Sequence, residues 1–284
     1  MFDPQRKRVK GDGVELELAV WPGDELPILC IHGLTANSRC WTTLAQGLTP
    51  KHGMIAFDLR GRGLSEKPES GYSIPIHCRD MVALMDGLGL PRAHIMGHSL
   101  GASIAALFAA EHPERVDHLV LLDGAGKLNK AQTARVVAGI TPSVQRLGQV
   151  YPSLEDYLSM LKNAPYLTDW TEAHEVYFRY EVEAAEGGVR TRTRLEHIME
   201  EITNLLNFEV SDYYSRIKCP TLIVRACRGM LRDDDILLPP NAVSRMTKSI
   251  LDTWLMSLEK ANHYSILFAK NEVRDNVILN FLRS

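Results

Sequence analysis

The stretch "IMGHSLGAS", residues 95–103, places Gly97, Ser99 and Gly101 in a G-x-S-x-G arrangement between an apolar run and an alanine-rich segment. This spacing is typical of a serine at the tip of a sharp turn from a strand into a helix. There the backbone is strained and the neighbouring residues must be small. The following segment, residues 100–114, would direct its N-terminal amides and positive dipole end towards Ser99. The motif therefore predicts a nucleophile, in preference to a serine that only caps a helix.

Further short runs rich in Val, Ile and Leu alternate with longer segments of helical periodicity along the chain. Unbroken apolar runs of this length predict a mostly parallel sheet that helices cover on both faces. The first run alternates polar and apolar residues, so we expect a half-exposed antiparallel strand there. The runs are residues 14–20, 27–33, 54–61, 93–99, 118–124, 221–226 and 253–259.

The alternation of apolar runs and helical segments stops over residues 126–217, where only helical patterns are found. Ser153 with Asp156 has the spacing of a capping box ahead of a stripe of leucines. We therefore expect a helical insertion that lies over the sheet, with a core formed by residues 1–125 and 218–284.

The composition is that of an ordinary globular protein, since 45% of the 284 residues are hydrophobic and 24% are charged. The formal net charge of −3 offers no basic field for nucleic acid or an anionic membrane. Residues 1–13 contain a basic cluster without an apolar segment behind it, so we expect neither a signal peptide nor a transmembrane start.

The five cysteines follow no disulfide or metal-binding spacing. They are therefore expected to be reduced thiols in a cytosolic protein. These are Cys30, Cys40, Cys78, Cys219 and Cys227.

Four motifs together resemble the α/β-hydrolase superfamily, in the expected order and over nearly the whole chain. They are a His-Gly loop at residues 30–41, a D-x-R-G-x-G-x-S segment at 57–68, the turn at Ser99, and a histidine loop at 259–268. The resemblance implies an α/β-hydrolase fold, with an eight-stranded, mostly parallel sheet and a helical cap inserted after strand six. The sequence looks most like the cap-bearing carboxylesterases and amide or enol-lactone hydrolases, including the hydrolase of (acetamidomethylene)succinate.

The resemblance also implies roles for individual residues. Ser99 would be the nucleophile, and His263 the base that removes its proton. The backbone amides of Leu34 and Leu100 would form the oxyanion hole. His32, within the His-Gly loop, is expected to be structural.

The order Ser, acid, His leaves two places for the acid of the triad. In the α/β-hydrolase family the acid usually follows the strand that here ends at Ala226. Asp233, Asp234 and Asp235 come after that strand, but they lie several residues beyond the family position, in a longer loop. Asp123 emerges directly from the apolar run "HLVLL", where a buried carboxylate needs a partner such as an imidazole. We therefore predict Asp123 as the acid, and keep the three later aspartates as the alternative.

Two groups in the insertion are open to a functional or a structural interpretation. Arg190, Arg192 and Arg194 would either bind a substrate carboxylate or begin a solvated helix, which is the commoner use. The aromatic residues would either line a pocket or form the core of the insertion. These are Trp170, Tyr177, Phe178 and Tyr180.

The sequence predicts no cofactor and no metal. "GRGLSE" lacks the third glycine of a dinucleotide loop, and no phosphate-loop or H-E-x-x-H motif occurs. Ser99 argues against epoxide hydrolases and haloalkane dehalogenases, which resemble this chain but need aspartate there. Hydrolases of carbon–carbon bonds usually have Trp after the catalytic histidine, where this chain has Tyr264.

We therefore expect a cytoplasmic, cofactor-free serine hydrolase that cleaves small carboxylic esters through an acyl-enzyme. Amide, enol-lactone or carbon–carbon cleavage by the same triad is the alternative. A non-catalytic ligand-binding protein on the same fold is the alternative from another class. The expected partner is a small-molecule substrate, and both a monomer and a homodimer are compatible with the sequence.

Overall fold

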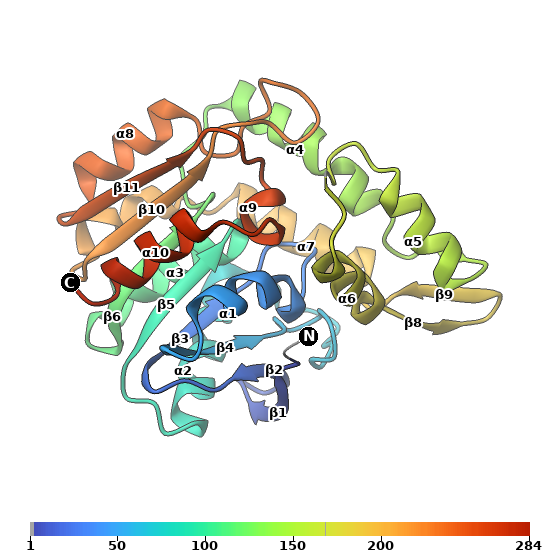
Figure 1. Cartoon of the computed structure of the whole chain (residues 1–284), viewed down its shortest axis with the longest axis horizontal. Coiled ribbons are helices and arrows are strands. Elements are labelled where there is room, and N and C mark those ends of the chain that lie inside the picture. The colour runs from blue at the N-terminus through green and yellow to red at the C-terminus, as the bar shows by residue number, and fades with distance from the viewer. Residues whose placement is uncertain (1–2, 168) are drawn as a thin grey trace.

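An eight-stranded sheet in the order β1-β2-β4-β3-β5-β6-β10-β11 runs through the molecule (Figure 1). The computed structural model describes residues 3–167 and 169–284. β2 pairs antiparallel with both of its neighbours, and the other pairs are parallel. The mostly parallel sheet predicted from the apolar runs is confirmed. Its strands are β1 Gln5–Lys10, β2 Glu15–Trp21, β3 Glu25–Ile31, β4 His52–Phe57, β5 Ala93–His98, β6 Val116–Leu122, β10 Thr221–Ala226 and β11 Thr253–Leu258.

The central strands are apolar because both of their faces are covered. In β3, Leu29 and Ile31 belong to one buried cluster, whereas Ile28 and Cys30 belong to a second cluster on the opposite face. Successive side chains of a strand point to opposite faces, so one strand contributes to both layers.

Helices α2 Ile74–Gly87, α3 Leu100–Glu111 and α8 Pro240–Ser249 contribute to the first cluster. Helices α1 Thr42–Leu48, α9 Ser265–Phe268 and α10 Glu272–Phe281 contribute to the second. The described residues also form three short 3₁₀ segments, η1 Ser38–Trp41, η2 Pro113–Arg115 and η3 Val210–Arg216. In the described part of the chain, no helix is long and apolar enough to cross a membrane.

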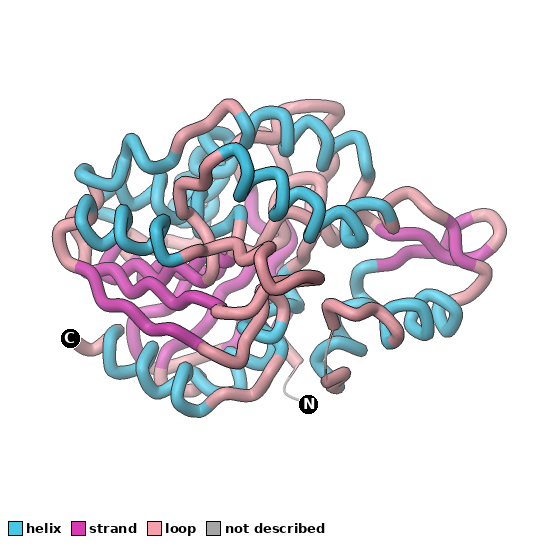
Figure 2. Tube along the Cα trace, turned by 90° about the horizontal axis from the view of Figure 1, so that it is seen from above, coloured by secondary structure: helices cyan, strands magenta, loops and turns pink. Residues whose placement is uncertain are grey.

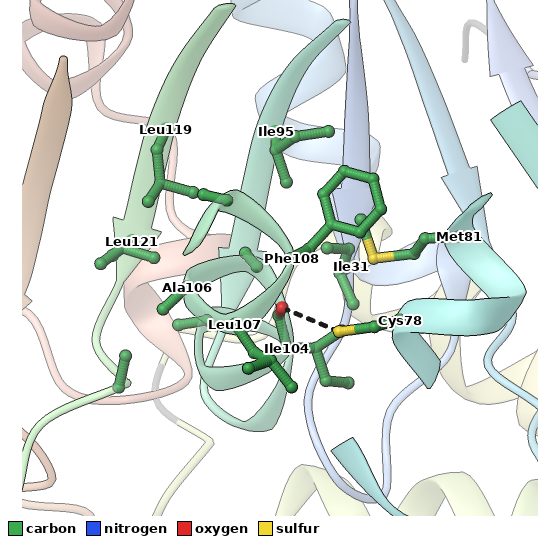
Figure 3. Close-up of a cluster of buried hydrophobic side chains, with 14 of the residues drawn as sticks. Ile31, Cys78, Met81, Ile95, Ile104, Ala106, Leu107, Phe108, Leu119 and Leu121 are labelled. Carbon is green, nitrogen blue, oxygen red and sulfur yellow. Dashed lines mark hydrogen bonds between the residues drawn. The ribbon is translucent and has the colours of Figure 1, made fainter. Parts of the chain in front are cut away.

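Helix α3 packs closely on the sheet because alanines line much of its length. Its larger residue Phe108 is fully buried, in the same cluster as Ile31, Met81 and Ile95 (Figure 3). On the neighbouring helix α2, the Cys78 thiol donates to the carbonyl oxygen of Ile104 at 3.6 Å. All five cysteines are free.

The segment between β6 and β10 is not purely helical, which corrects the sequence-based expectation. It contains α4 Lys130–Gln145, α5 Leu154–Lys162, α6 Glu172–Glu181 and α7 Leu195–Leu206, and also strands β7 Val150–Tyr151, β8 Val182–Ala185 and β9 Gly188–Thr191. These strands form a small antiparallel sheet in the order β7-β9-β8. The β8–β9 hairpin projects away from the main sheet (Figures 1 and 2).

Ser153 caps α5 as predicted, because its hydroxyl accepts from the amide of Asp156 at 3.1 Å. The Asp156 carboxylate accepts from that hydroxyl, and among the described residues it makes no return bond to the Ser153 amide, so the full capping box is not formed. Near the end of the insertion, η3 packs against α3 of the core through Val210 and Tyr214. The predicted insertion of residues 126–217 thus includes η3, which packs on the core. The boundaries between core and insertion stay a prediction.

Candidate active site

Ser99 lies at the junction of β5 and α3 with φ 58° and ψ −120°. This conformation is strained for a residue with a side chain, as the motif predicted. A Cβ on Gly97 would lie 2.1 Å from the carbonyl oxygen of Gly101, and one on Gly101 would lie 2.0 Å from that of Ile31. Both glycines are therefore required for the close approach of the turn to its neighbouring backbone.

The carboxyl ends of β5 and β6 are adjacent in the sheet, so Ser99 and Asp123 lie at the same edge. Asp123 Oδ2 is 2.8 Å from His263 Nδ1, and both side chains are buried. Asp123 Oδ1 accepts a hydrogen bond from the amide of Ala226 at 3.1 Å. The carboxylate therefore fixes the orientation of the imidazole and is itself held by β10.

The three later aspartates lie elsewhere. Asp235 is buried, and its carboxylate accepts from the amides of Met230, Leu231 and Arg232 in its own loop. Asp234 lies 3.4 Å from Arg232 and from a second arginine on α4. Asp233 is exposed. The structure thus places Asp123 beside His263. The carboxylates of the three later aspartates instead bind their own loop, pair with arginines or face solvent.

Ser99 and His263 line one cavity together with His98 and Leu34. Among the described residues, no hydrogen bond joins the Ser99 hydroxyl to His263. Such contacts are often loose in a site without substrate and tighten when the substrate binds. No group of metal-ligating side chains in the described ranges includes any triad residue.

Leu34 and Leu100 line the same cavity as Ser99. In the described chain neither amide N–H donates a hydrogen bond to a protein acceptor, so both are available for an oxyanion. Gly33 brings the first loop close, because a Cβ there would lie 3.2 Å from Ser99 Cβ. The arrangement is compatible with the predicted oxyanion hole.

His32 is hydrogen-bonded within the loop that carries Leu34. Its Nδ1 donates to the carbonyl of Gly33 at 2.8 Å, and its Nε2 accepts from the amide of Leu59 at 3.0 Å. Burial lowers the pKa of His32 to about 3, so the ring is neutral. Its position supports the structural role expected from the sequence.

Arg62 connects the same loop to the insertion, and the sequence alone did not indicate this. Its Nε donates to the carbonyl of Leu34 at 3.1 Å, and its Nη2 lies 3.0 Å from Glu201 on α7. His77 lies 2.7 Å from the same carboxylate, and all three side chains are fully buried. Burial alone would raise the pKa of Glu201, but His77 and Arg62 together outweigh it and hold the pKa at about 2.

His98, the residue before the candidate nucleophile, stacks on His263 with ring centroids 4.4 Å apart. Its Nε2 donates to the carbonyl of His263 at 3.0 Å. Burial, followed by the proximity of His263, lowers the pKa of His98 well below its ordinary range. A neutral imidazole thus supports the loop that carries the candidate base. The G-x-S-x-G pattern, which leaves this position unspecified, did not reveal it.

The cavity is lined mainly by apolar side chains from the core and the insertion. Two of the predicted aromatic residues, Tyr177 and Phe178, line it, whereas Trp170 and Tyr180 are not among its described lining residues. Other lining residues are Ile140, Leu167, Leu237, Leu267 and Phe268.

Arg146 is the charged residue in this lining, and it is already paired. Its Nη2 lies 2.6 Å from Glu181, and its Nη1 donates to the carbonyl of Ser143. The hydroxyl of Tyr157 donates to the other oxygen of Glu181. The Arg146–Glu181 pair therefore adds no net charge to the wall of the cavity.

The "RTRTR" arginines lie outside the described lining of this cavity. Arg190 is in strand β9 and pairs with Glu183 across the hairpin at 3.3 Å, and Arg192 also pairs with Glu183 at 3.5 Å. Only Arg194 adjoins a helix, as the N-cap of α7. The expectation that this run begins a helix is thus correct only for its last arginine.

A family model described as alpha/beta hydrolase fold matches residues 27–270. The chain is 28% identical over 283 residues to a serine hydrolase-like protein of Danio rerio, covering 95% of this chain and 85% of the relative. It is 28% identical over 248 residues to a putative carbamate hydrolase of Variovorax paradoxus, covering 85% and 86%.

The chain is also 27% identical over 260 residues to 2-(acetamidomethylene)succinate hydrolase of Mesorhizobium japonicum, covering 90% of this chain and 87% of the relative. A crystal structure of E-2-(acetamidomethylene)succinate hydrolase matches with a TM-score of 0.85 and 24% identity, covering 99% of this chain and all of the other. At this identity, the structural likeness shows the fold.

Proposed function

Because the chain belongs to the alpha/beta hydrolase fold family, as its four motifs predicted, we propose that it is a serine hydrolase that cleaves small carboxylic esters through an acyl-enzyme intermediate. The observation that carries the proposal is the buried His263–Asp123 pair at 2.8 Å, beside a serine on a strained turn. Ser99 and His263 line an apolar cavity, and the names of the relatives also support hydrolysis.

In the first half of the proposed reaction, Ser99 Oγ attacks the carbonyl carbon of the ester while His263 Nε2 takes the hydroxyl proton. Asp123 holds Nδ1–H of His263 and stabilises the imidazolium that forms. The amides of Leu34 and Leu100 donate to the developing oxyanion. His263 then gives its proton to the departing alkoxide, which leaves as the alcohol.

In the second half, His263 takes a proton from water, whose oxygen attacks the acyl carbon. Collapse of the second tetrahedral intermediate breaks the bond to Ser99 Oγ, which regains its proton from His263. The products are a carboxylic acid and an alcohol, and the residues return to their starting protonation states. The neutral Arg146–Glu181 pair in the wall supports an uncharged, apolar acyl group.

The proposal is tested with short-chain p-nitrophenyl esters and a fluorophosphonate probe. Wild type should hydrolyse the esters and be labelled on Ser99. Ser99→Ala should show neither ester hydrolysis nor labelling. Ser244→Ala is the matched control, because Ser244 is an exposed serine on α8 outside the described lining of the cavity. Failure of wild type to be labelled, together with no turnover of any ester, would contradict the proposal. A ligand-binding protein that retains an active triad would be labelled without multiple turnovers.

Carbamate or amide hydrolysis is the second candidate, and the names of the relatives favour it. The same triad would serve, with an amine as the leaving group in place of an alcohol. The two candidates are separated by kcat/KM for an ester, a carbamate and an amide that share one acyl group. A higher value for the carbamate or amide would favour the second candidate. A cytoplasmic location is also part of the proposal and is supported by the five free cysteines.

A further inference from the structure

A second cluster of reactive side chains lies at the amino ends of the strands that carry the candidate active site at their carboxyl ends. His94 is the second residue of β5, and Asp117 and His118 are the second and third residues of β6. Strands rise about 3.3 Å per residue, which places His94 about 16 Å from Ser99 along β5. The cluster is therefore separate from the triad.

The three side chains converge. Each offers one ligand atom, and these atoms all lie within 4.8 Å of one another. Asp117 Oδ2 is 2.7 Å from His118 Nδ1 and 3.3 Å from His94 Nδ1. Around a tetrahedral Zn²⁺ with bonds of about 2.0–2.1 Å, two ligand atoms lie about 3.3 Å apart. The His94–Asp117 separation already matches this value, and the His118–Asp117 pair needs to open by a few tenths of an ångström.

His94 is the second observation that indicates a ligand. Its ring is almost fully buried, and its Nδ1 has no hydrogen-bond partner among the described residues, despite its proximity to Asp117. A buried polar atom without a partner is unfavourable and needs an explanation. One nitrogen of a neutral imidazole carries a free lone pair. A metal ion would accept that lone pair.

The surroundings suit a partly closed site with access from solvent. The Asp117 side chain is 23% exposed, and its other oxygen, Oδ1, is held 3.0 Å from Arg92 Nη1. Arg92 thereby leaves Oδ2 facing the two histidines. His52 at the start of β4 packs edge-on against His94 and limits the movement of that ring.

We propose that His94, Asp117 and His118 bind a divalent transition metal ion, with Zn²⁺ as the best fit. Two imidazoles and one carboxylate are ligands that Zn²⁺ accepts, whereas Mg²⁺ and Ca²⁺ require mainly oxygen ligands. The fourth tetrahedral position would be filled by water. The bound ion would join the amino ends of β5 and β6. This revises the expectation of no metal, because ligands that meet across two strands leave no linear motif.

Binding is measured by competition between the EDTA-treated, dialysed protein and a chromophoric zinc chelator. We expect one Zn²⁺ per chain, with affinity reduced by at least about 100-fold in His94→Gln, Asp117→Asn and His118→Gln, because loss of a ligand costs more than the roughly 10–100-fold typical of its outer-shell partners. His112→Gln is the matched control, because His112 lies outside the cluster in the chain segment just before β6. The Zn²⁺ affinity of His112→Gln should equal that of wild type.

Thermal unfolding gives a second readout that does not depend on activity. Added Zn²⁺ should raise the Tm of wild type in proportion to the logarithm of its concentration, because only the folded chain holds the three ligands together. At the same Zn²⁺ concentration the rise should be smaller in His94→Gln, because its higher Kd moves the rise to higher concentration. Cooperative unfolding of this variant in EDTA shows that it folds. No binding by wild type, or equal binding by wild type and the three cluster variants, would overturn the proposal and leave the cluster as a hydrogen-bonded ion pair.

Discussion

At the residue scale, Asp123 is central to the candidate site because it accepts from both His263 and Ala226. Replacing it with Asn preserves the size but removes the charge and favours the wrong tautomer of the imidazole. We expect Asp123→Asn to lower kcat for ester hydrolysis by about 10⁴-fold, the size seen when a triad aspartate is lost. The measurement is kcat on a p-nitrophenyl ester.

Asp234→Asn is the control for that change, since Asp234 faces Arg135 and Arg232 at the surface. Its kcat should stay within about twofold of wild type, because exposed ion pairs contribute little. A large loss in this variant with normal activity in Asp123→Asn would reassign the acid. Asp235 is unsuitable as a control because its buried carboxylate holds the loop of residues 230–232.

His98 is proposed as a positioning residue for His263. His98→Ala removes the stacked ring and the hydrogen bond to the His263 carbonyl. Since one such bond contributes about 1 kcal/mol, we expect kcat to fall about five- to tenfold, with a smaller change in KM. His98→Gln, which retains an amide donor, should recover part of kcat. Equal loss in both variants, or a change in Tm alone, would indicate a purely structural residue.

The sequence predicted Asp123 as the partner of His263, because an aspartate directly after an apolar strand has few possible uses, and the two side chains lie 2.8 Å apart. It did not reveal His98 or Arg62. Their partners lie far away in the chain, as with the 165 positions between His98 and the carbonyl that it contacts. Such roles follow from contacts between loops, and these have no local pattern.

At the element scale, the strands buried on both faces were predicted closely, because their composition follows directly from their burial. β1 was not predicted. It is an edge strand with Val9 as its one buried side chain, and Arg6 and Arg8 pair with Glu17 on β2. The β8–β9 hairpin was missed for a similar reason, since its short strands carry charged side chains that pair across the hairpin.

Helix α7 is anchored to the core through Glu201, which contacts both Arg62 and His77. Glu201→Gln leaves Arg62 as a buried charge without its counter-ion. We expect it to lower the free energy of unfolding by about 3–5 kcal/mol at pH 7, as measured by urea denaturation. Glu196→Gln, an exposed position on the same helix, should change it by less than about 0.5 kcal/mol.

The comparison of wild type with Glu201→Gln also gives a prediction about the pH dependence of stability. The pKa of Glu201 is about 2 in the folded chain and about 4.5 when unperturbed, so unfolded chains bind this proton first as the pH falls. The stabilisation by Glu201 is therefore fully present above about pH 4.5 and is lost as the pH falls towards 2. The stability difference between wild type and Glu201→Gln should shrink over that range. A difference independent of pH would contradict this account.

At the scale of the whole molecule, stability depends on the two buried layers on either side of the sheet. Phe108 is fully buried where α3 meets β3 and β5 (Figure 3). Phe108→Ala leaves a cavity and should lower the free energy of unfolding by about 3–5 kcal/mol. Val273→Ala is a control, because Val273 is 67% exposed on α10. Equal effects in the two variants would show that the first layer does not limit stability.

The backbone conformation of Ser99 lowers the folding stability of the whole molecule. Its φ of 58° with ψ of −120° is a conformation that glycine adopts freely, and holding any other residue there costs about 1–3 kcal/mol. The most stable sequence for this backbone is therefore not the one proposed to be active. Laboratory evolution for heat resistance alone would favour glycine at position 99, and only simultaneous selection for turnover would retain the serine.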